Sequence, residues 1–426
     1  MGTSLRDSLV RLWPTLRDTG WLLVGDGANR GTRFAITLLL ARHLDPEHFG
    51  RWIVAFTTAL MLGLIAEFGL PFIVTREVAI DATRGGRRLG QALLVKVAAA
   101  WLAVAVAFPI SAVFGGETAV VFLILTSYAV ADTFAQLFTA VFRGRLKMHL
   151  EAALRGLQAI LTMTLVVALI VADAPLWLVA SAMAAATLPS IVGGVVLARR
   201  LVPIVWVLDR GEILALARAA VPILVSSIAF LLYFRIDILL LKVMRSEGEV
   251  GLYGAAYAMV WPLTIVPMLY AQSVYPRFSS ADAARRSALY RDALFIAGAY
   301  GVLVLGGVAL FGRSVFLQIV GDQYAEAAPL LVVFAAAFAL YGLSHTSFYL
   351  LYSRARYGAV VTTTFLGIAF NVGANLLFIP AFGVMGAATT TLLTEIVVLV
   401  VLLGLNKDVL FGSKGEVQQE SAAHAA

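Results

Sequence analysis

The sequence predicts an all-α polytopic membrane protein with about twelve transmembrane helices in two six-helix bundles, related by a pseudo-two-fold axis along the membrane normal. Three observations support this: the composition, a series of long apolar segments and a faint internal repeat. Of the 426 residues, 61% are hydrophobic and 13% are charged, and the mean hydropathy is +0.91. A soluble domain of this size could not solvate so much apolar surface, so the chain belongs in a bilayer.

Apolar windows of about twenty residues, the length that crosses the hydrocarbon core as a helix, locate the spans. The connections between them are short. Two of the segments, 152–172 and 175–198, are separated by a tight turn before Pro175 and should form an antiparallel pair. The twelve spans are predicted at 19–41, 52–75, 90–113, 118–142, 152–172, 175–198, 213–241, 250–276, 288–312, 327–352, 358–380 and 383–406.

Lys and Arg set the predicted orientation, because cytoplasmic loops carry an excess of both residues. With the N-terminus in the cytoplasm, 23 of them lie on the inner side, five lie outside and four lie within spans. Both termini are therefore predicted to be cytoplasmic. The same bias explains the net charge of +7, so a nucleic acid partner is not needed to account for it.

The spans divide the chain into four predicted parts. Residues 1–18 mix apolar residues with three arginines and lack the continuous apolar core of a signal peptide, which favours an interfacial amphipathic segment. Residues 19–205 form the N-terminal six-helix bundle and residues 206–406 the C-terminal one. Residues 407–426 form a polar cytoplasmic tail.

The repeat relates the two predicted bundles. A shift of 201 positions lays Gly50 and Trp52 over Gly251 and Tyr253, and each pair stands at the end of the first outer loop of its half. Six spans per half is an even number, so both halves have the same topology. The axis that relates them then runs along the membrane normal, with the two bundles facing each other across a cleft.

Charged side chains inside the predicted spans are costly in hydrocarbon and therefore indicate function. In the first span, Asp26, Arg30 and Arg33 share one helix face, on which Asp26 can pair with Arg30. A structural ion pair fits this pattern, but the second arginine favours an anion-binding surface. In the seventh span, Arg235 and Asp237 are two residues apart, point in different directions and need separate partners or water.

Further polar residues complete the candidate set. Lys96 in the third span is a candidate cation of the cavity, with snorkelling to the interface as the alternative. Carboxylates kept in a membrane interior commonly mark ion pathways. The candidates for ion or proton coupling are therefore Asp26, Glu67, Asp132, Asp237 and Glu395.

Four uncharged or neutral polar residues are candidates for the cavity wall. Asn371 and Asn375 share a helix face, which suits either an interhelical hydrogen bond or a sugar-facing wall. Gln272 and His345 are the other two candidates, although an isolated histidine in a span is more often a satisfied interior residue.

Several site classes are missing from the sequence. The run GDGANRG, residues 25–31, is not a phosphate loop, because no strand precedes it and no GK[ST] follows it. Gly27 and Gly31 are instead predicted to be small residues for close helix packing. Metal signatures, nucleophile elbows and cysteine are absent, so the sequence predicts no cofactor, no bound metal and no catalytic residue.

Two strings of the sequence carry recognisable motifs. The first is RIDILLLKVMRSEGEVGLYGAAYAMV, residues 235–260, which has an Asp in the seventh predicted helix and then a G-x-Y-x-A-x-Y stretch. The second is LLLARHLDPEHFGRW, residues 38–52, with an F-G-x-W element. Both strings resemble the polysaccharide flippases of the Wzx type, in the multidrug/oligosaccharidyl-lipid/polysaccharide transporter superfamily. The twelve spans and short loops fit this family over nearly the whole chain.

The resemblance implies a non-enzymatic flippase in the bacterial cytoplasmic (inner) membrane. Its cargo would be polyprenyl-diphosphate-linked oligosaccharide repeat units for O-antigen, capsule or exopolysaccharide, moved to the outer leaflet by alternating access. Arg30, Arg33 and Arg235 would bind the diphosphate, with Lys96 as a further cation. The partners would be the lipid-linked glycan and membrane lipid, with a polysaccharide polymerase and glycosyltransferases as further candidates.

Two alternatives remain at this point. A multidrug exporter of the same superfamily would use a similar scaffold, although an acidic, aromatic cavity would suit organic cations better than three arginines. A polysaccharide polymerase or ligase would be an enzyme, but such proteins usually carry a sizeable outer loop for chemistry, and the predicted outer loops are short.

Overall fold

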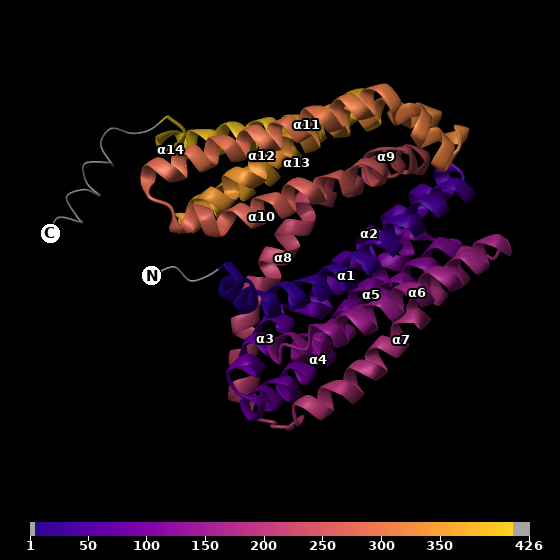
Figure 1. The fold of residues 1–426 in the computed structure, drawn as a ribbon. Helices are drawn as coiled ribbons and strands as arrows, with labels where there is room; N and C mark the ends of the chain where they lie inside the picture. Colours follow the sequence, from indigo (N-terminus) through magenta and orange to yellow (C-terminus); the bar gives the residue numbers. More distant parts are fainter. Residues whose placement is uncertain (1–4, 412–426) are drawn as a thin grey trace. The chain divides into compact units, whose positions relative to one another are not determined.

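The computed structural model describes the backbone of residues 5–411 and the side chains of residues 21, 24, 25 and 27–411. Within this part of the chain the secondary structure is helical, without strands (Figure 1). The helices are α1 (Leu5–His43), α2 (Pro46–Glu67), α3 (Leu70–Ile80), α4 (Ala82–Phe114), α5 (Gly116–Gly144), α6 (Met148–Val171), α7 (Leu176–Leu201), α8 (Arg210–Met244), α9 (Glu247–Val260), η1 (Trp261–Thr264), α10 (Ile265–Ser280), α11 (Ala283–Val320), η2 (Asp322–Ala327), α12 (Ala328–Ser353), α13 (Tyr357–Leu405) and α14 (Lys407–Phe411).

The helices pack into two compact units. The first unit consists of Met1–Leu40 and Arg51–Leu231, and the second of Ala41–Gly50 and Leu232–Ala426. The chain crosses between them within α8 and at both ends of residues 41–50. The bundle boundary at 205/206 stays a prediction. The side chains of residues 1–18 and of Asp26, and the tail beyond residue 411, lie outside the described residues.

Ten segments of the described chain are long and apolar enough to cross a membrane. One of them, α13, has 49 residues and would be about 74 Å long, more than twice the roughly 30 Å of a hydrocarbon core. Gly383 (φ 56°, ψ −136°) breaks it into the two spans predicted at 358–380 and 383–406. The backbone of α1 covers the predicted first span, so the prediction of about twelve helical spans is confirmed.

The second span of each half is interrupted, which the sequence did not predict. Helix α2 ends at Glu67, and Phe68 (φ 55°) and Gly69 (φ 67°) have left-handed backbone conformations before α3 begins. In the other half, α9 passes through the 3-10 helix η1, which contains Pro262, before α10 continues. Hydropathy windows read both regions as continuous because apolarity does not change across the breaks. Interrupted helices matter because their free backbone groups need partners inside the membrane.

Short polar side chains fix where several helices begin. The Asp81 side chain accepts a hydrogen bond from the Arg84 backbone N–H (2.7 Å) at the start of α4. Ser246 and Glu249 form a capping box at the start of α9, where each side chain satisfies the other's backbone donor. These caps define where α4 and α9 begin.

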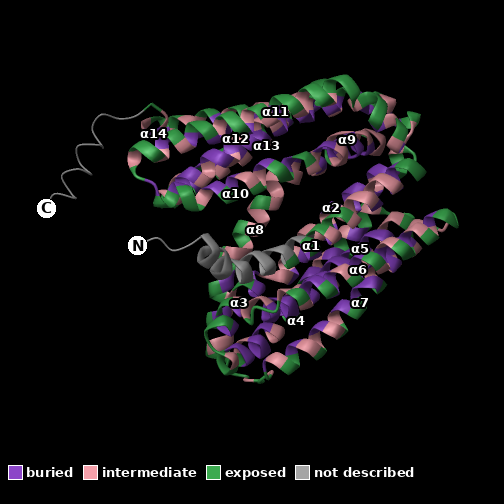
Figure 2. Cartoon of the chain, viewed as in Figure 1, coloured by how far each residue is buried: buried purple, intermediate pink, exposed green. Residues whose placement is uncertain are grey.

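Burial differs sharply between helices (Figure 2). Helix α5 of the first unit and α12 of the second are largely enclosed, with 56% and 61% of their most apolar windows buried. Helices α4 and α11 bury 17% and 11% of theirs and present apolar residues outward, as lipid-facing helices do. Polar side chains on α5 and α12 therefore lie inside protein, where each one needs a partner.

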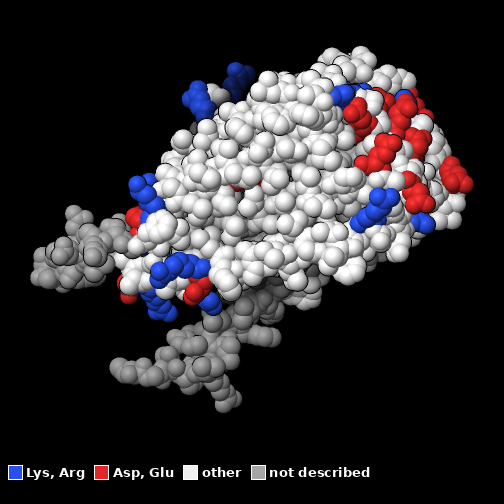
Figure 3. Space-filling view, turned by 90° about the horizontal axis from the view of Figure 1, so that it is seen from above, with Lys and Arg blue, Asp and Glu red and all other residues white. Residues whose placement is uncertain are grey.

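The charged residues on the face seen in Figure 3 gather at two ends and leave a wide uncharged middle, as a surface that crosses a bilayer requires. In the second unit, a group of acidic residues lies around the starts of α2, α9 and η2, together with Arg42, Lys242 and Arg245. A group of basic residues lies around the start of α11, the end of α12 and α14, together with Asp282 and Asp408. The acidic group is Asp45, Glu47, Glu247, Glu249, Asp322 and Glu326, and the basic group is Arg285, Arg286, Arg354, Arg356 and Lys407.

The predicted packing role of Gly27 and Gly31 is wrong. Among the residues that the structure describes, a Cβ atom built at either position has no atom of another helix within 4 Å, and both residues are exposed. The close contact on α1 is made by Gly25, whose Cβ would lie 2.9 Å from the Ala152 Cα. Gly27 and Gly31 are four residues apart and share one face of α1. Gly25 lies on another face, and that face is turned towards α6.

Candidate functional site

A cavity of about 540 Å³ lies in the first unit, among α1, α2, α3, α5 and the first part of α8. Most of its wall is apolar, with side chains such as Leu60, Phe72 and Phe230. A mostly apolar pocket with a few placed polar groups is the usual form of a ligand site. The polar residues of the wall are Arg33, Glu67, Tyr128, Asp132, Thr133, Gln136, Ser226 and Ser227.

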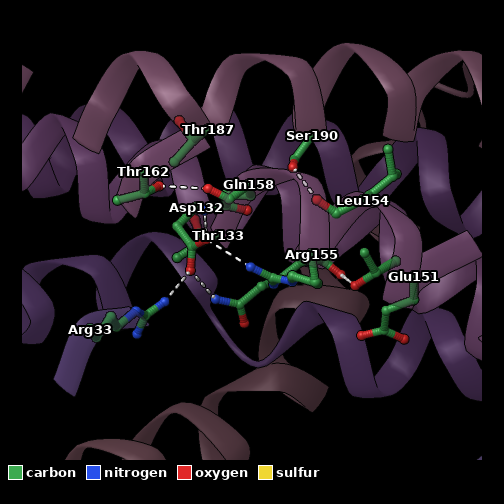
Figure 4. A network of polar contacts seen from close by, with 12 residues as sticks. Arg33, Asp132, Thr133, Glu151, Leu154, Arg155, Gln158, Thr162, Thr187 and Ser190 are labelled. Carbon is green, nitrogen blue, oxygen red and sulfur yellow. Dashed lines mark hydrogen bonds and ion pairs between the residues drawn. The ribbon is translucent and has the colours of Figure 1, made fainter. Parts of the chain in front are cut away.

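Asp132 is the centre of the polar side of this cavity (Figure 4). Its Oδ2 accepts hydrogen bonds from Arg33 Nη2 (3.1 Å) and Gln136 Nε2 (3.0 Å). Its Oδ1 accepts hydrogen bonds from Arg155 Nη1 (2.8 Å) and Gln158 Nε2 (2.9 Å). Four donors around a buried carboxylate satisfy its charge, which makes Asp132 an anchor for the cations around it.

Two arginines contact Asp132, one on each carboxylate oxygen. Arg155 is 5% exposed and is held inside the protein, whereas the Arg33 side chain is 33% exposed and lines the cavity. Arg33 and Arg155 share the Asp132 carboxylate, and Glu67 places a second carboxylate in the same cavity wall. Because Asp132 fixes Arg33 from one side, the guanidinium has a defined orientation at the wall of the cavity.

Glu67 and Lys96 lie at the break between α2 and α3. Glu67 ends α2 and lines the cavity. Lys96 is not among the lining residues; it is fully buried, donates from Nζ to the Ala66 carbonyl (3.0 Å) and stands 5.1 Å above the Phe134 ring. A cation that bonds a free carbonyl at a helix C-terminus is favourably placed. Lys96 thus supports the broken helix behind the cavity wall.

Sequence reasoning missed Arg155 and Gln158. Both are on α6, three residues apart, and their side chains point to Asp132. Arg155 falls near the inner end of its span, where an arginine reads as a loop or interface residue. The spacing of Glu151, Arg155 and Gln158 on one helix face is the signal that could have found them.

The three arginines predicted to share a cavity are divided between the units. Arg33 lines the cavity of the first unit, and Arg30 lies one turn before it on α1, exposed. Arg235 is in the second unit, where its guanidinium carbon lies 5.1 Å from the Tyr257 ring centroid. The convergence of all three on one ligand stays a prediction.

Asp237 and Glu395 lie together in the second unit. They border a narrow crevice of about 10 Å³, with room for one water molecule, which Asn371 also lines. Asp237 accepts hydrogen bonds from the Tyr253 hydroxyl and the Ile238 N–H. Glu395 Oε1 accepts one from the Tyr233 hydroxyl (2.8 Å). Both carboxylates are 4% exposed, and the donors of these hydrogen bonds are uncharged groups.

The four candidate wall residues separate into two pairs. Asn371 donates to Thr394 Oγ1 (3.2 Å) and so links the two halves of α13, and it accepts from Asn375 Nδ2 (2.9 Å) within its own half. Gln272 on α10 and His345 on α12 lie elsewhere in the second unit, and both contact Tyr349. The interhelical hydrogen bond is therefore formed, and Asn371 still reaches the crevice.

Comparisons with known proteins agree with this architecture. Residues 15–282, more than half of the chain, match the family described as polysaccharide biosynthesis protein. The probable low-salt glycan biosynthesis flippase Agl15 of Haloferax volcanii is 22% identical over 399 residues, which cover 88% of this chain and 79% of that protein.

Two solved structures share the fold. The lipid II flippase MurJ in an inward closed conformation has a TM-score of 0.74 at 10% identity, and the match covers 91% of this chain and 87% of that one. A multidrug resistance MATE family transporter of the MOP superfamily, inward-facing, has a TM-score of 0.72 at 15% identity over 92% and 100% of the two chains. The chain belongs to the polysaccharide biosynthesis protein family, and it has the helical fold of the MOP superfamily transporters and flippases.

Proposed function

We propose that this protein is a flippase that moves polyprenyl-diphosphate-linked oligosaccharides from the inner to the outer leaflet by alternating access. The observation that carries the proposal is the cavity of the first unit, whose mostly apolar wall holds the Arg33 guanidinium, oriented by Asp132, among uncharged polar groups. A diphosphate needs cations, and a sugar chain needs a route away from hydrocarbon. The family match and the name of the Haloferax relative support a role in glycan biosynthesis.

The proposal includes a location and an orientation. Transport of this kind starts where the lipid-linked glycan is made, so we place the protein in the cytoplasmic membrane with both termini inside. Lys and Arg of the second unit are more numerous at the end where α11 starts and α12 ends than at the opposite end, and this excess supports the orientation. O-antigen, capsule and exopolysaccharide precursors are all cargoes of this chemical class. A polymerase and glycosyltransferases would be its functional partners.

The central test replaces the cavity arginine and measures transport. Arg33→Ala removes a charge-assisted contact to the diphosphate worth about 1.5–3 kcal/mol, which corresponds to roughly a ten- to 150-fold loss of affinity. Arg30→Ala and Arg235→Ala test the other two proposed anion ligands. Arg200→Ala, an exposed arginine at the end of α7, is the matched control. The assay is restoration of surface polysaccharide in a flippase-null strain, together with membrane levels of each variant.

The outcomes separate the candidate functions. Loss of complementation in Arg33→Ala, but not in Arg200→Ala, supports the flippase. Full complementation by a normally inserted Arg33/Arg30/Arg235 triple alanine variant would overturn the cationic cavity. Export of organic cations without any flippase activity would instead identify a multidrug exporter, and glycan polymerisation by the purified protein would identify an enzyme.

We also propose that Asp237 and Glu395 couple transport to an ion or proton gradient. Both border the same crevice and receive hydrogen bonds from uncharged donors, whereas Asp132 is neutralised by two arginines. Asp26 and Glu67 remain further candidates. In proteoliposomes, uptake of a lipid-linked sugar should respond to an imposed proton or sodium gradient. Asp237→Asn or Glu395→Gln should abolish that response, while Asp132→Asn should not do so selectively. Gradient-independent transport by the parent protein would assign these carboxylates a structural role.

A further inference from the structure

Ring side chains follow one face of α12 in the second unit. Tyr341, His345, Tyr349 and Tyr352 are spaced by four, four and three residues, so they share this face. Neighbouring rings contact one another, with centroid distances of 5.1 Å (Tyr341–His345), 5.2 Å (His345–Tyr349) and 5.8 Å (Tyr349–Tyr352). Tyr275 of α10 adds a fifth ring, 5.6 Å from Tyr349. We call these five residues the aromatic face.

The aromatic face continues towards Arg235. Trp261 of η1 lies 6.4 Å from the Tyr341 ring and stacks at 5.6 Å on Tyr257, the residue that holds the Arg235 guanidinium. A series of rings therefore runs from a proposed anion ligand to the end of α12. The break at η1 matters here, because the 3-10 turn is the element that carries Trp261.

The members of this face are amphipathic. Tyr352 is 37% exposed, and Tyr275, His345 and Tyr349 are partly exposed, although α12 is the most enclosed candidate span of the described chain. Helices that face lipid in this protein, such as α11, present aliphatic residues and phenylalanine, for example Phe295 at 77% exposure. A row of tyrosines on an enclosed helix thus differs in chemistry from the lipid-facing surface.

Two polar groups stand beside these rings. The Gln272 side chain lies against Tyr349. The Nε2 atom of His345 is buried and has no hydrogen-bond partner among the described residues. An unsatisfied buried polar atom calls for a partner, which a ligand or a water molecule can supply. By contrast, the buried Tyr290 hydroxyl, on the other side of α12, is paired with Ser347 Oγ at 2.8 Å, as a purely structural tyrosine should be.

We propose that the aromatic face binds the sugar rings of the cargo by stacking, and that Gln272 and His345 hydrogen-bond their hydroxyl groups. The inference rests on the proposed flippase function and assigns the glycan, as distinct from the diphosphate, to residues of the second unit. A sugar ring has an apolar face of C–H groups and a rim of hydroxyls, which matches ring faces with polar edges. None of the five members carries a fixed charge, so a diphosphate or a lipid tail would gain less from this surface.

The test compares two probes that differ in their sugar. Undecaprenyl diphosphate and the same lipid bearing a chitobiose unit are titrated against the full-length protein in nanodiscs, and the ratio of the two Kd values measures what the sugar contributes. In the parent protein the glycosylated probe should bind more tightly. Tyr349→Leu/Tyr352→Leu should reduce that advantage by about tenfold and leave the sugar-free probe within about twofold. Tyr349→Phe/Tyr352→Phe keeps the rings and should retain most of the advantage.

Control variants separate the sugar-binding proposal from the flippase proposal. Phe295→Leu removes an exposed ring from α11 and should leave the ratio unchanged, and Tyr352→Leu alone serves if the double variant folds poorly. Arg33→Ala should weaken both probes equally. An unchanged ratio in Tyr349→Leu/Tyr352→Leu, or equal binding of both probes to the parent, would overturn the aromatic face while leaving the flippase proposal standing. Binding of neither probe to the parent would overturn the flippase proposal, and the inference with it.

Discussion

Arg155 donates a 2.8 Å hydrogen bond to Asp132 Oδ1, and neither residue is more than 5% exposed. Removing one partner of a buried ion pair typically costs about 3–5 kcal/mol, because the other charge is left uncompensated. Removing both is often close to neutral. This contrast separates a structural pair from a residue whose charge is needed for transport.

Asp132→Leu should therefore destabilise the protein strongly, and Asp132→Leu/Arg155→Met should recover most of the lost thermal stability in detergent. Glu212→Gln breaks the more exposed Arg87–Glu212 pair and should cost at most about 1 kcal/mol. If the double variant is as unstable as Asp132→Leu, the contact of Asp132 with Arg33 rather than with Arg155 controls the stability of this site.

Two glycines at the start of α2 and α9 should tolerate no side chain. A Cβ at Gly50 would lie 1.8 Å from the Glu247 carbonyl oxygen, and a Cβ at Gly251 would lie 1.8 Å from the Pro46 carbonyl oxygen. Because these contacts are with backbone, Gly50→Ala or Gly251→Ala should lower stability by about 1–3 kcal/mol. Gly27→Ala is the control: it meets no atom and should gain up to about 1 kcal/mol from helix propensity. Equal thermal shifts for all three variants would contradict this packing.

Lys96→Met should destabilise the end of α2, where the chain breaks before α3. The substitution keeps an unbranched side chain, one atom shorter, but leaves the Ala66 carbonyl without its donor, at a cost of about 1–3 kcal/mol. Thermal unfolding would measure the loss, with the exposed Lys147→Met as the matched control. If Lys96→Met is as stable as Lys147→Met, the charge is dispensable at the helix end.

The predicted orientation can be tested directly, because the sequence has no cysteine to mask. Gly116→Cys and Asp173→Cys should react with an impermeant thiol reagent added to intact cells, whereas Arg87→Cys should not. Each of these positions lies at or near a helix end in the structure. Labelling of Arg87→Cys from outside would contradict the predicted orientation.

Acid should loosen the attachment of α14. Burial raises the pKa of the Asp408 carboxyl, but the hydrogen bond and charge of Arg354 outweigh it and hold this pKa below its usual value of 3.8. A depressed pKa adds stability above pH 3.8, and this contribution disappears as pH falls through the lower, folded value. Hydrogen exchange of Lys407–Phe411 should therefore accelerate at low pH in the parent, and Asp408→Asn should exchange faster already at pH 7. An exchange rate independent of pH in the parent, after correction for intrinsic chemistry, would exclude this contact as the anchor.

The sequence was sufficient for the helices but not for their interruptions. Apolar length located the spans, including the two that meet at Gly383. It did not reveal the break at Phe68 and Gly69, because a left-handed turn between apolar residues leaves hydropathy unchanged. Prolines such as Pro71 and Pro262 just inside the following helical segments were the available hint.

The sequence indicated which charged residues lie within the spans, but not which of them meet in space. Charges isolated within apolar segments identified Arg33, Asp132 and Glu67, which the structure brings to one cavity. Arg155 was missed because its position at the edge of a span hides a residue whose long side chain reaches inward. Which candidates meet depends on helix rotation and crossing, and these properties follow from packing across the whole unit.

Residues 41–50 are joined to the rest of the second unit by a set of hydrogen bonds to main-chain carbonyls. Arg42 donates to the carbonyls of Gln318 (2.6 Å) and Ile319 (3.1 Å), Gln323 donates to the Arg42 carbonyl (3.2 Å), and Tyr324 donates to the Leu44 carbonyl (3.0 Å). Every acceptor here is main chain, which any amino acid supplies equally well. Substitutions at positions 318, 319 and 44 can therefore accumulate during evolution without compensating changes. Residue covariation among related sequences should be weak at this joint, and methods that infer contacts from covariation will underestimate it.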